Sequence, residues 1–389
     1  MRLFISVGFC AIHFIKSANC KENLKKTLRF EKKLLKMNSQ QSNVTPGVGL
    51  VLLVLLALIG SVFFMVIGGL VSMLLTESSS ISEALSADYT NLDGLNSIRI
   101  LQSFQTLGLF IFPAVLFAFI HTKQPFTFLG FNRVSLRFLL LSVAFMFIAL
   151  PGINFLASLN ALIPMPQWAI DLELKALEIT EALLTTKSFT IFLSNIFVVA
   201  VLPALGEELF FRGVMQPFVI KLLRNSVGFL QSFFTKLLNK SFWGILKPLI
   251  TKLLQNSFWT VYHSFSSKLL QNPFLGIFIT AFVFSAIHFQ FQGFIPRLAL
   301  GMMFGYLYLW SGSLWVPIAV HFVNNASATI VFYLIGNGKL PAHTENIGEL
   351  NQLWAVGLTS IIFAGVLGYL LWTEKSKKLN AVVGQPANE

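Results

Sequence analysis

Long apolar stretches separated by short polar segments make up most of this chain. Eight of them approach the about 20 residues that an α-helix needs to cross a bilayer. They cover roughly residues 48–76, 99–121, 137–159, 188–211, 275–291, 297–311, 314–335 and 353–373. The stretches are uniformly apolar and do not alternate, so membrane-spanning strands are not favoured. The pattern predicts an all-α polytopic membrane protein with about eight transmembrane helices, of which the sixth is short.

Charges in the connecting segments predict the orientation of these helices. The segment before the first stretch is basic, the loop 77–98 is acidic, and the loop 122–136 contains Lys123 and Arg133. Residues 213–274 carry only basic charges, and Lys375 lies in the tail 374–389. Because Lys and Arg gather on the cytosolic side, the N-terminus and the tail are expected in the cytosol. Residues 160–187 have mixed charge, and only alternation places them outside.

The composition agrees with a bilayer environment. Hydrophobic residues make up 55% of the 389 residues and charged residues only 11%, with 41 Phe. Soluble domains usually carry about 25% charged residues, and one soluble core could not bury so many Phe. The two cysteines, Cys10 and Cys20, have neither metal-binding spacing nor a disulfide framework around them.

The net charge of +12 comes from two basic segments. Residues 1–36 and 221–274 each carry +7, so the remainder of the chain is slightly acidic. Basic segments beside apolar helices favour anionic lipid headgroups as partners, and no motif supports binding to nucleic acid. Polar residues follow Met37, which favours a start there and makes residues 1–36 an upstream extension. The alternative is a basic arm that contacts the membrane.

Residues 221–274 form a basic insert with an internal repeat. A Lys-Leu-Leu unit begins at Lys221 as Lys-Leu-Leu-Arg and recurs at Lys236, Lys252 and Lys268, followed in the later copies by Phe or Trp. The spacing indicates tandem duplication of one short unit, and its period is too short for common solenoid folds. A tolerated expansion without its own function is favoured, because loop insertions cost little. Amphipathic helices at the headgroup level are the alternative. The insert separates a first group of helices, 48–211, from a second group, 275–373.

Ionisable side chains inside apolar helices are costly and usually functional. The fourth stretch contains Glu207, Glu208 and Arg212, the fifth His288, and the seventh His321 and Asn325. Two of these pairs are four residues apart and therefore share a helix face. They are Glu208 with Arg212 and His321 with Asn325. Taken alone, Glu208 with Arg212 could be a structural ion pair and His288 a packing histidine, whereas the combination favours a site.

Two acids, two imidazoles and a carboxamide suit hydrolysis. A buried carboxylate can act as a general base towards water, and His and Asn can donate to an oxyanion. Arg212 would compensate the burial cost of Glu208. The assumed limits of the helices leave one tension, because they put Glu207 near the cytosolic end of its helix and His288 nearer the external end.

Three motifs in order, Glu-Glu-x-x-x-Arg, Phe-x-x-x-His and His-x-x-x-Asn, resemble the CAAX-processing and bacteriocin-processing (CPBP, or Abi) intramembrane proteases, also called type II CAAX prenyl endopeptidases. They begin at Glu207, Phe284 and His321. The resemblance implies that Glu207 activates water with help from His288. His321 and Asn325 would bind the oxyanion, with Glu208 and Arg212 in support. The longer stretch between Arg212 and Phe284, which holds the repeats, departs from the family pattern.

The resemblance implies a peptidase in a bacterial inner membrane, acting on a CAAX-type peptide, a leader peptide or a membrane-protein segment. A metal-free mechanism is preferred. The alternative is zinc held by Glu207, His288 and His321, although these lack the close spacing of common zinc proteases. A non-catalytic self-immunity or scaffold protein of the same family is the competing function. A proton-coupled transporter ranks last, because the membrane helices show no internal repeat.

Overall fold

The computed structural model describes residues 44–76, 80, 85, 88–226, 272–351 and 353–383. Within these ranges the chain is helical and contains no strand, which confirms the all-α prediction. The elements are α3 (Pro46–Leu75), α5 (Leu92–Thr106), η1 (Leu107–Ile111), α6 (Phe112–His121), α7 (Pro125–Leu129), α8 (Leu136–Asn160), α9 (Gln167–Leu184), α10 (Phe189–Asn195), η2 (Ile196–Val201), α11 (Leu202–Glu208), η3 (Leu209–Met215), α15 (Pro273–Ala286), α16 (Phe294–Ser311), α17 (Trp315–Gly336), η5 (Ala342–Asn346) and α18 (Trp354–Val383).

Six helices in the described residues are long and apolar enough to cross a membrane. They are Pro46–Leu75, Leu92–His121, Leu136–Asn160, Phe189–Ser226, Trp315–Gly336 and Trp354–Lys375. The count of eight is therefore not confirmed. The expected fifth stretch is the 14-residue helix α15, and the expected sixth, which contains Arg297, is the 18-residue helix α16. The chain is a multi-pass membrane protein in which these two shorter helices pack against each other.

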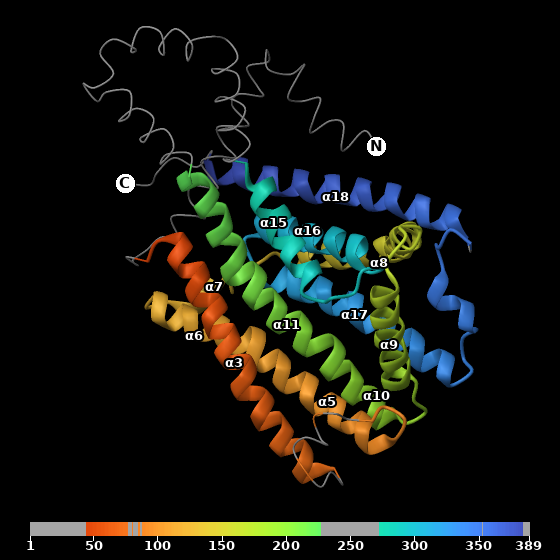
Figure 1. Cartoon of the computed structure of the whole chain (residues 1–389). Coiled ribbons are helices and arrows are strands. Elements are labelled where there is room, and N and C mark those ends of the chain that lie inside the picture. The colour runs from red at the N-terminus through yellow and green to blue at the C-terminus, as the bar shows by residue number, and fades with distance from the viewer. Residues whose placement is uncertain are drawn as a thin grey trace, which may run out of the picture.

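The helices surround α17 and the long helix that contains α11 (Figure 1). α17 contacts α8, α11 and α16, whereas α18 packs along α8, and α3 packs along α5, η1 and α6. Near its start, α3 approaches the end of the long helix, where Gly49 faces the ring of Phe218. The two central helices bring the first and third motifs together, although more than 100 residues separate them in the sequence.

The expected limit of the fourth helix, residue 211, was wrong. The helix continues from Phe189 to Ser226, a length of 38 residues, so Glu207 lies at its middle. Its last six residues, 221–226, are the first copy of the repeat, which begins at Lys221. α15 begins beside that end, because Gly276 packs against the backbone of Ile220. From this contact, α15 runs back along the long helix. Phe284, near the end of α15, places its ring against the guanidinium of Arg212. This removes the tension in depth between Glu207 and His288.

Prolines explain two of the three π-helical segments. η1 immediately precedes the turn with Pro113, and η2 precedes the turn with Pro203. Proline lacks an N–H and clashes with the preceding turn, so a wider turn just before it relieves the clash. The third segment, η3, contains Arg212 and no proline. As a result, wide turns flank Glu207 and Glu208 on both sides.

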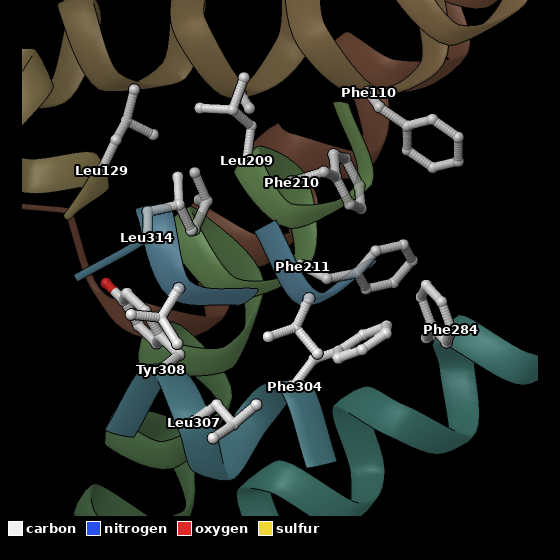
Figure 2. Close-up of a cluster of buried hydrophobic side chains, with 14 of the residues drawn as sticks. Phe110, Leu129, Leu209, Phe210, Phe211, Phe284, Phe304, Leu307, Tyr308 and Leu314 are labelled. Carbon is white, nitrogen blue, oxygen red and sulfur yellow. The ribbon is translucent and has the colours of Figure 1, made fainter. Parts of the chain in front are cut away.

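A cluster of buried apolar side chains packs beside the three motif helices (Figure 2). Phe211, Phe284 and Phe304 come from three different helices and lie near one another in this cluster. The close approach depends on Gly301, where an added Cβ would lie 2.9 Å from the Ala281 side chain. The small-residue pair Gly301 and Gly305 therefore serves helix packing.

One element was missed, and other predictions lie beyond the described residues. The segment 160–187 was expected to be an external loop, but most of it forms helix α9, whose hydrophobic residues include exposed Trp168 and Leu177. The N-terminal extension 1–36 and the insert from residue 227 to 271 fall outside the described residues. The first part of the tail continues α18 to Val383.

Candidate functional site

Glu208, Arg212 and His321 form a buried charged network. Arg212 Nη1 donates to Glu208 Oε1 at 2.8 Å, and the same oxygen lies 2.9 Å from His321 Nδ1. Both Glu208 and Arg212 have no exposed surface. The Glu208 oxygen that accepts from Arg212 is also an acceptor towards the imidazole, so Nδ1–H of His321 is the donor in this contact. This network joins the first motif to the third.

Arg212 also contacts the backbone of α16, and aromatic rings lie around its guanidinium. Nη2 donates to the carbonyl of Gly301 at 3.1 Å. The guanidinium carbon lies 4.7 Å from the centre of the Phe284 ring and 5.3 Å from that of Phe304. Phe211 contributes a more distant ring at 5.8 Å. These contacts compensate a cation in an apolar setting, which fits the supporting role expected for Arg212.

Glu207 has a different environment from its neighbour. Its side chain is buried, and among the described residues Oε2 has no hydrogen-bond partner. Glu207 Oε2 lies 4.0 Å from His321 Nε2. A separation of this size between two polar atoms is suited to one water molecule between them. Glu208 Oε2 likewise has no partner among the described residues, but Glu208 Oε1 is held by Arg212 and His321, so Glu207 is the less constrained of the two carboxylates.

His288 lies just beyond the C-terminal end of α15. Its Nδ1 is 2.7 Å from the carbonyl oxygen of Phe284, four residues earlier. A carbonyl can only accept, so Nδ1 carries the proton and Nε2 of the neutral ring keeps a lone pair. The Phe284 ring separates the two imidazoles, with centroids 5.3 Å from His288 and 6.1 Å from His321. The Phe-x-x-x-His motif therefore sets both the tautomer and the place of His288.

Asn325 contacts the backbone of the helix that carries Glu207. Its Nδ2 donates to the carbonyl of Val199 at 3.0 Å. Pro203, four residues after Val199, has no N–H to offer that carbonyl, so the side chain of Asn325 supplies a donor instead. Asn324 Nδ2 in turn donates to Asn325 Oδ1 at 3.0 Å. One N–H of Asn325 is thereby committed to helix contact and the second remains for another acceptor.

Sequence reasoning missed Arg297 on the first turn of α16. Arg297 interacts electrostatically with Glu207, and it also acts on His288 and Glu173. Its Nη1 donates to the carbonyl of Gln290 at 3.2 Å, and Nη2 contacts the Gln290 side-chain oxygen. The signal was present, because Arg297 is the one charged residue of α16. It lay at the expected boundary of the sixth stretch and was not counted among the intramembrane groups.

The alternative with zinc was tested against the donor geometry. In the part of the chain that the structure describes, no three His, Cys, Asp or Glu side chains converge closely enough to hold a metal ion. Glu207, His288 and His321 therefore do not fit a metal in this arrangement, and no step proposed below passes through one.

Comparison with known proteins supports the family resemblance that the three motifs indicated. Residues 189–327 match the family model described as type II CAAX prenyl endopeptidase Rce1-like. Among curated proteins, the chain is 30% identical over 78 residues to the uncharacterized protein YpbD of Bacillus subtilis (strain 168). That similarity covers 18% of this chain and only 41% of the relative. No solved structure matches.

The matched segment contains all six expected site residues. They are Glu207, Glu208, Arg212, His288, His321 and Asn325. The geometry joins Glu208, Arg212 and His321 directly, places Glu207 beside them, and ties Asn325 to their helix. Through residues 189–327, the chain carries an Rce1-like domain of the type II CAAX prenyl endopeptidase family.

Proposed function

We propose that this protein is an intramembrane endopeptidase that hydrolyses a peptide bond with a water activated by Glu207. The observation that carries the proposal is the buried Glu207 carboxylate, whose Oε2 has no hydrogen-bond partner among the described residues and lies 4.0 Å from His321 Nε2. A carboxylate positioned in this way can accept a proton from a bound water. The Rce1-like domain supplies the reaction class, cleavage of a peptide bond.

Glu207 suits the role of base better than Glu208. The Oε1 atom of Glu208 already accepts from Arg212 and faces His321 Nδ1. A carboxylate stabilised by a cation and a second donor binds a further proton weakly. Glu208 instead fixes the orientation of His321, as a second residue commonly does for a functional imidazole.

The reaction then follows from the positions of the side chains. Glu207 takes a proton from water, and the hydroxide oxygen bonds to the carbonyl carbon of the peptide. The resulting oxyanion accepts hydrogen bonds from His321 and from the second N–H of Asn325. With Nδ1 facing Glu208, His321 donates through Nε2 as an imidazolium in this step. When the C–N bond breaks, the protonated Glu207 returns its proton to the amine.

His288 assists with proton transfer in this scheme. Because Nδ1–H is bonded to the Phe284 carbonyl, Nε2 is the available base. As the product carboxylate forms, it accepts the second proton of the attacking water and passes it to the departing amine, which leaves as an ammonium group. Glu207 and His288 act on the water, whereas His321 and Asn325 act on the peptide carbonyl.

The substrate is a peptide or membrane-protein segment that reaches the site at the membrane. The family name indicates a prenylated C-terminal peptide, and leader-peptide processing is the other substrate class that the motifs suggest. The charge pattern favours a bacterial inner membrane protein with both termini in the cytosol and anionic lipid headgroups at its basic segments.

A reconstituted cleavage assay tests the proposal. The probe is an internally quenched peptide ending in a prenylated Cys, two aliphatic residues and one terminal residue. The same peptide without the prenyl group measures the role of the lipid. We expect the purified protein in lipid nanodiscs to cleave the prenylated probe, with products identified by mass spectrometry. The Glu207→Ala protein gives the background rate. Absence of cleavage above that background with both peptides would refute the proposed CAAX-type activity.

A further inference from the structure

We propose that Asn160 is a positioning residue that holds the turn carrying His288. This inference rests on the proposed function, because it assigns Asn160 a role in that reaction through His288. Asn160 is the last residue of α8, far in sequence from all three motifs, and it lies just beyond the expected end of the third apolar stretch. Its side chain is only 3% exposed.

The turn between α15 and α16 needs to be held from outside. Residues 287–293 connect the two helices, and Phe289, directly after His288, has φ of +52°. A bulky non-glycine residue rarely adopts this left-handed conformation, and it persists only where surrounding contacts impose it. The Phe289 side chain is 73% exposed, so its own packing contributes little to that restraint. The restraint must come from other parts of the turn.

Asn160 supplies two of the contacts that fix this turn. Its Nδ2 donates to the carbonyl of Phe291 at 2.8 Å, and its Oδ1 accepts from the N–H of Ile295 at 3.0 Å. The two ends of one buried amide group thus bridge the turn and the first turn of α16. A shorter side chain would leave the Phe291 carbonyl and the Ile295 N–H without this partner, which costs free energy.

Side chains from three further helices hold neighbouring positions of the same turn. Glu173 of α9 accepts from the N–H of Gln292 at 3.3 Å. Arg297 of α16 donates to the Gln290 carbonyl at 3.2 Å, and Ser285 of α15 donates to the Phe294 carbonyl at 2.7 Å. With Asn160 from α8, four helices meet at the turn. Of the four side chains that bond to the turn, Asn160 is the one that is uncharged, buried and outside the motif helices.

The link to chemistry is His288. The Nδ1 contact with the Phe284 carbonyl orients the His288 ring relative to α15. The position of the His288 backbone depends on the turn. A displacement of about 1 Å in a catalytic group can lower the rate about 100-fold. Asn160 therefore affects turnover without touching substrate, and its loss should lower kcat more than it changes KM.

The test compares matched substitutions in the full-length protein in nanodiscs, with the prenylated probe. Asn160→Ala removes the contacts with the turn. Asn154→Ala is the control, because Asn154 lies on the same helix and donates to the carbonyls of Glu345 and Ile347 at 2.8 and 3.1 Å, outside the motifs. Glu173→Ala is a second test variant, which removes a different contact with the same turn. Because Glu173 is partly exposed, this variant remains a test even if Asn160→Ala does not fold. The control for Glu173→Ala is Glu178→Ala on the same helix.

We expect kcat to fall about 10- to 100-fold in Asn160→Ala, with a smaller fall in Glu173→Ala and with KM unchanged in both. Amide hydrogen exchange should accelerate in residues 287–295 of Asn160→Ala and not in Asn154→Ala. Unchanged kcat in both test variants, or an equal loss in Asn154→Ala, would overturn the proposal. Amide hydrogen exchange does not require activity. If no peptide is cleaved, the proposed function fails, but the exchange experiment still tests whether Asn160 fixes the turn. Unchanged exchange in Asn160→Ala would refute that hold directly.

Discussion

Glu207 and Glu208 are neighbours in the chain, but their contacts give them different functions. The Oε2 atoms of both acids have no hydrogen-bond partner in the described part of the chain, but Glu208 Oε1 is held by Arg212 and His321, whereas Glu207 Oε2 lies 4.0 Å from His321 Nε2. The sequence alone could identify both acids, because charged residues inside apolar helices stand out. It could not show which acid remains available, since that depends on residue 321, more than 100 positions away.

Stability should separate the two acids. In Glu208→Gln, the buried Arg212 loses its ionic partner at 2.8 Å. Loss of one partner of a buried ion pair costs about 3–5 kcal/mol, so the thermal midpoint in nanodiscs should fall clearly. Glu207→Gln, which leaves the Arg212 bond in place, is the matched control and should retain the wild-type midpoint. Equal destabilisation of both variants would contradict the division of function between these acids.

Residues that hold the site from its edge were harder to identify from sequence. Asn160 and Arg297 lie at the limits of apolar stretches, where polar residues are ordinary and carry no signal of burial. They bond to the turn after His288 only because α8 and α16 pack around that turn. The motif residues were predictable because each stands inside an apolar helix, whereas these two depend on contacts distant in sequence.

At the scale of helices, close packing depends on small residues. Gly301 and Gly305 of α16 face α15, and their carbonyls accept from Arg212 and Gln216 at 3.1 Å each. The sequence indicated the close packing through the spacing of the two glycines. It did not indicate the π-helical segments beside Glu207 and Glu208, since prolines alone do not determine how a helix absorbs them.

Gly301→Ala tests this packing. An added Cβ would lie 2.9 Å from the Ala281 side chain and 3.1 Å from its Cα, which is too close without movement of α15. We expect a loss of about 1–3 kcal/mol in unfolding free energy, as for other overpacked contacts. Gly365→Ala on α18 is the control, because nothing lies within 4 Å of its added Cβ. That control should be neutral or slightly stabilising. Wild-type stability in Gly301→Ala would show that α15 and α16 do not approach this closely.

At the scale of the whole molecule, hydropathy predicted an all-helical membrane protein but not the number of crossings. The structure has six long apolar helices in its described residues, with α15 and α16 shorter or less apolar. An apolar run shows that residues avoid water, yet a helix buried among other helices satisfies the same requirement. For this reason, hydropathy alone does not distinguish a membrane-spanning α15 from a short apolar helix packed among others.

The basic insert can be tested at the same scale. The end of the long helix and the start of α15 are already adjacent, because Gly276 packs against Ile220. Replacement of residues 227–271 by a short Gly/Ser linker should therefore preserve both helices, since the closure cost of a loop depends only weakly on its length. We expect an unchanged thermal midpoint and unchanged turnover of the prenylated probe. Loss of the folded protein or of turnover would assign the insert a structural or functional role.

The most direct test of the central claim is the turnover of Glu207→Gln with the prenylated probe in nanodiscs. The amide keeps the shape of the side chain but cannot take a proton from water. If Glu207 is the base, kcat should fall by about 100- to 10,000-fold while the thermal midpoint stays at the wild-type value. Wild-type turnover in a folded Glu207→Gln protein would contradict the account, because water would then be activated elsewhere.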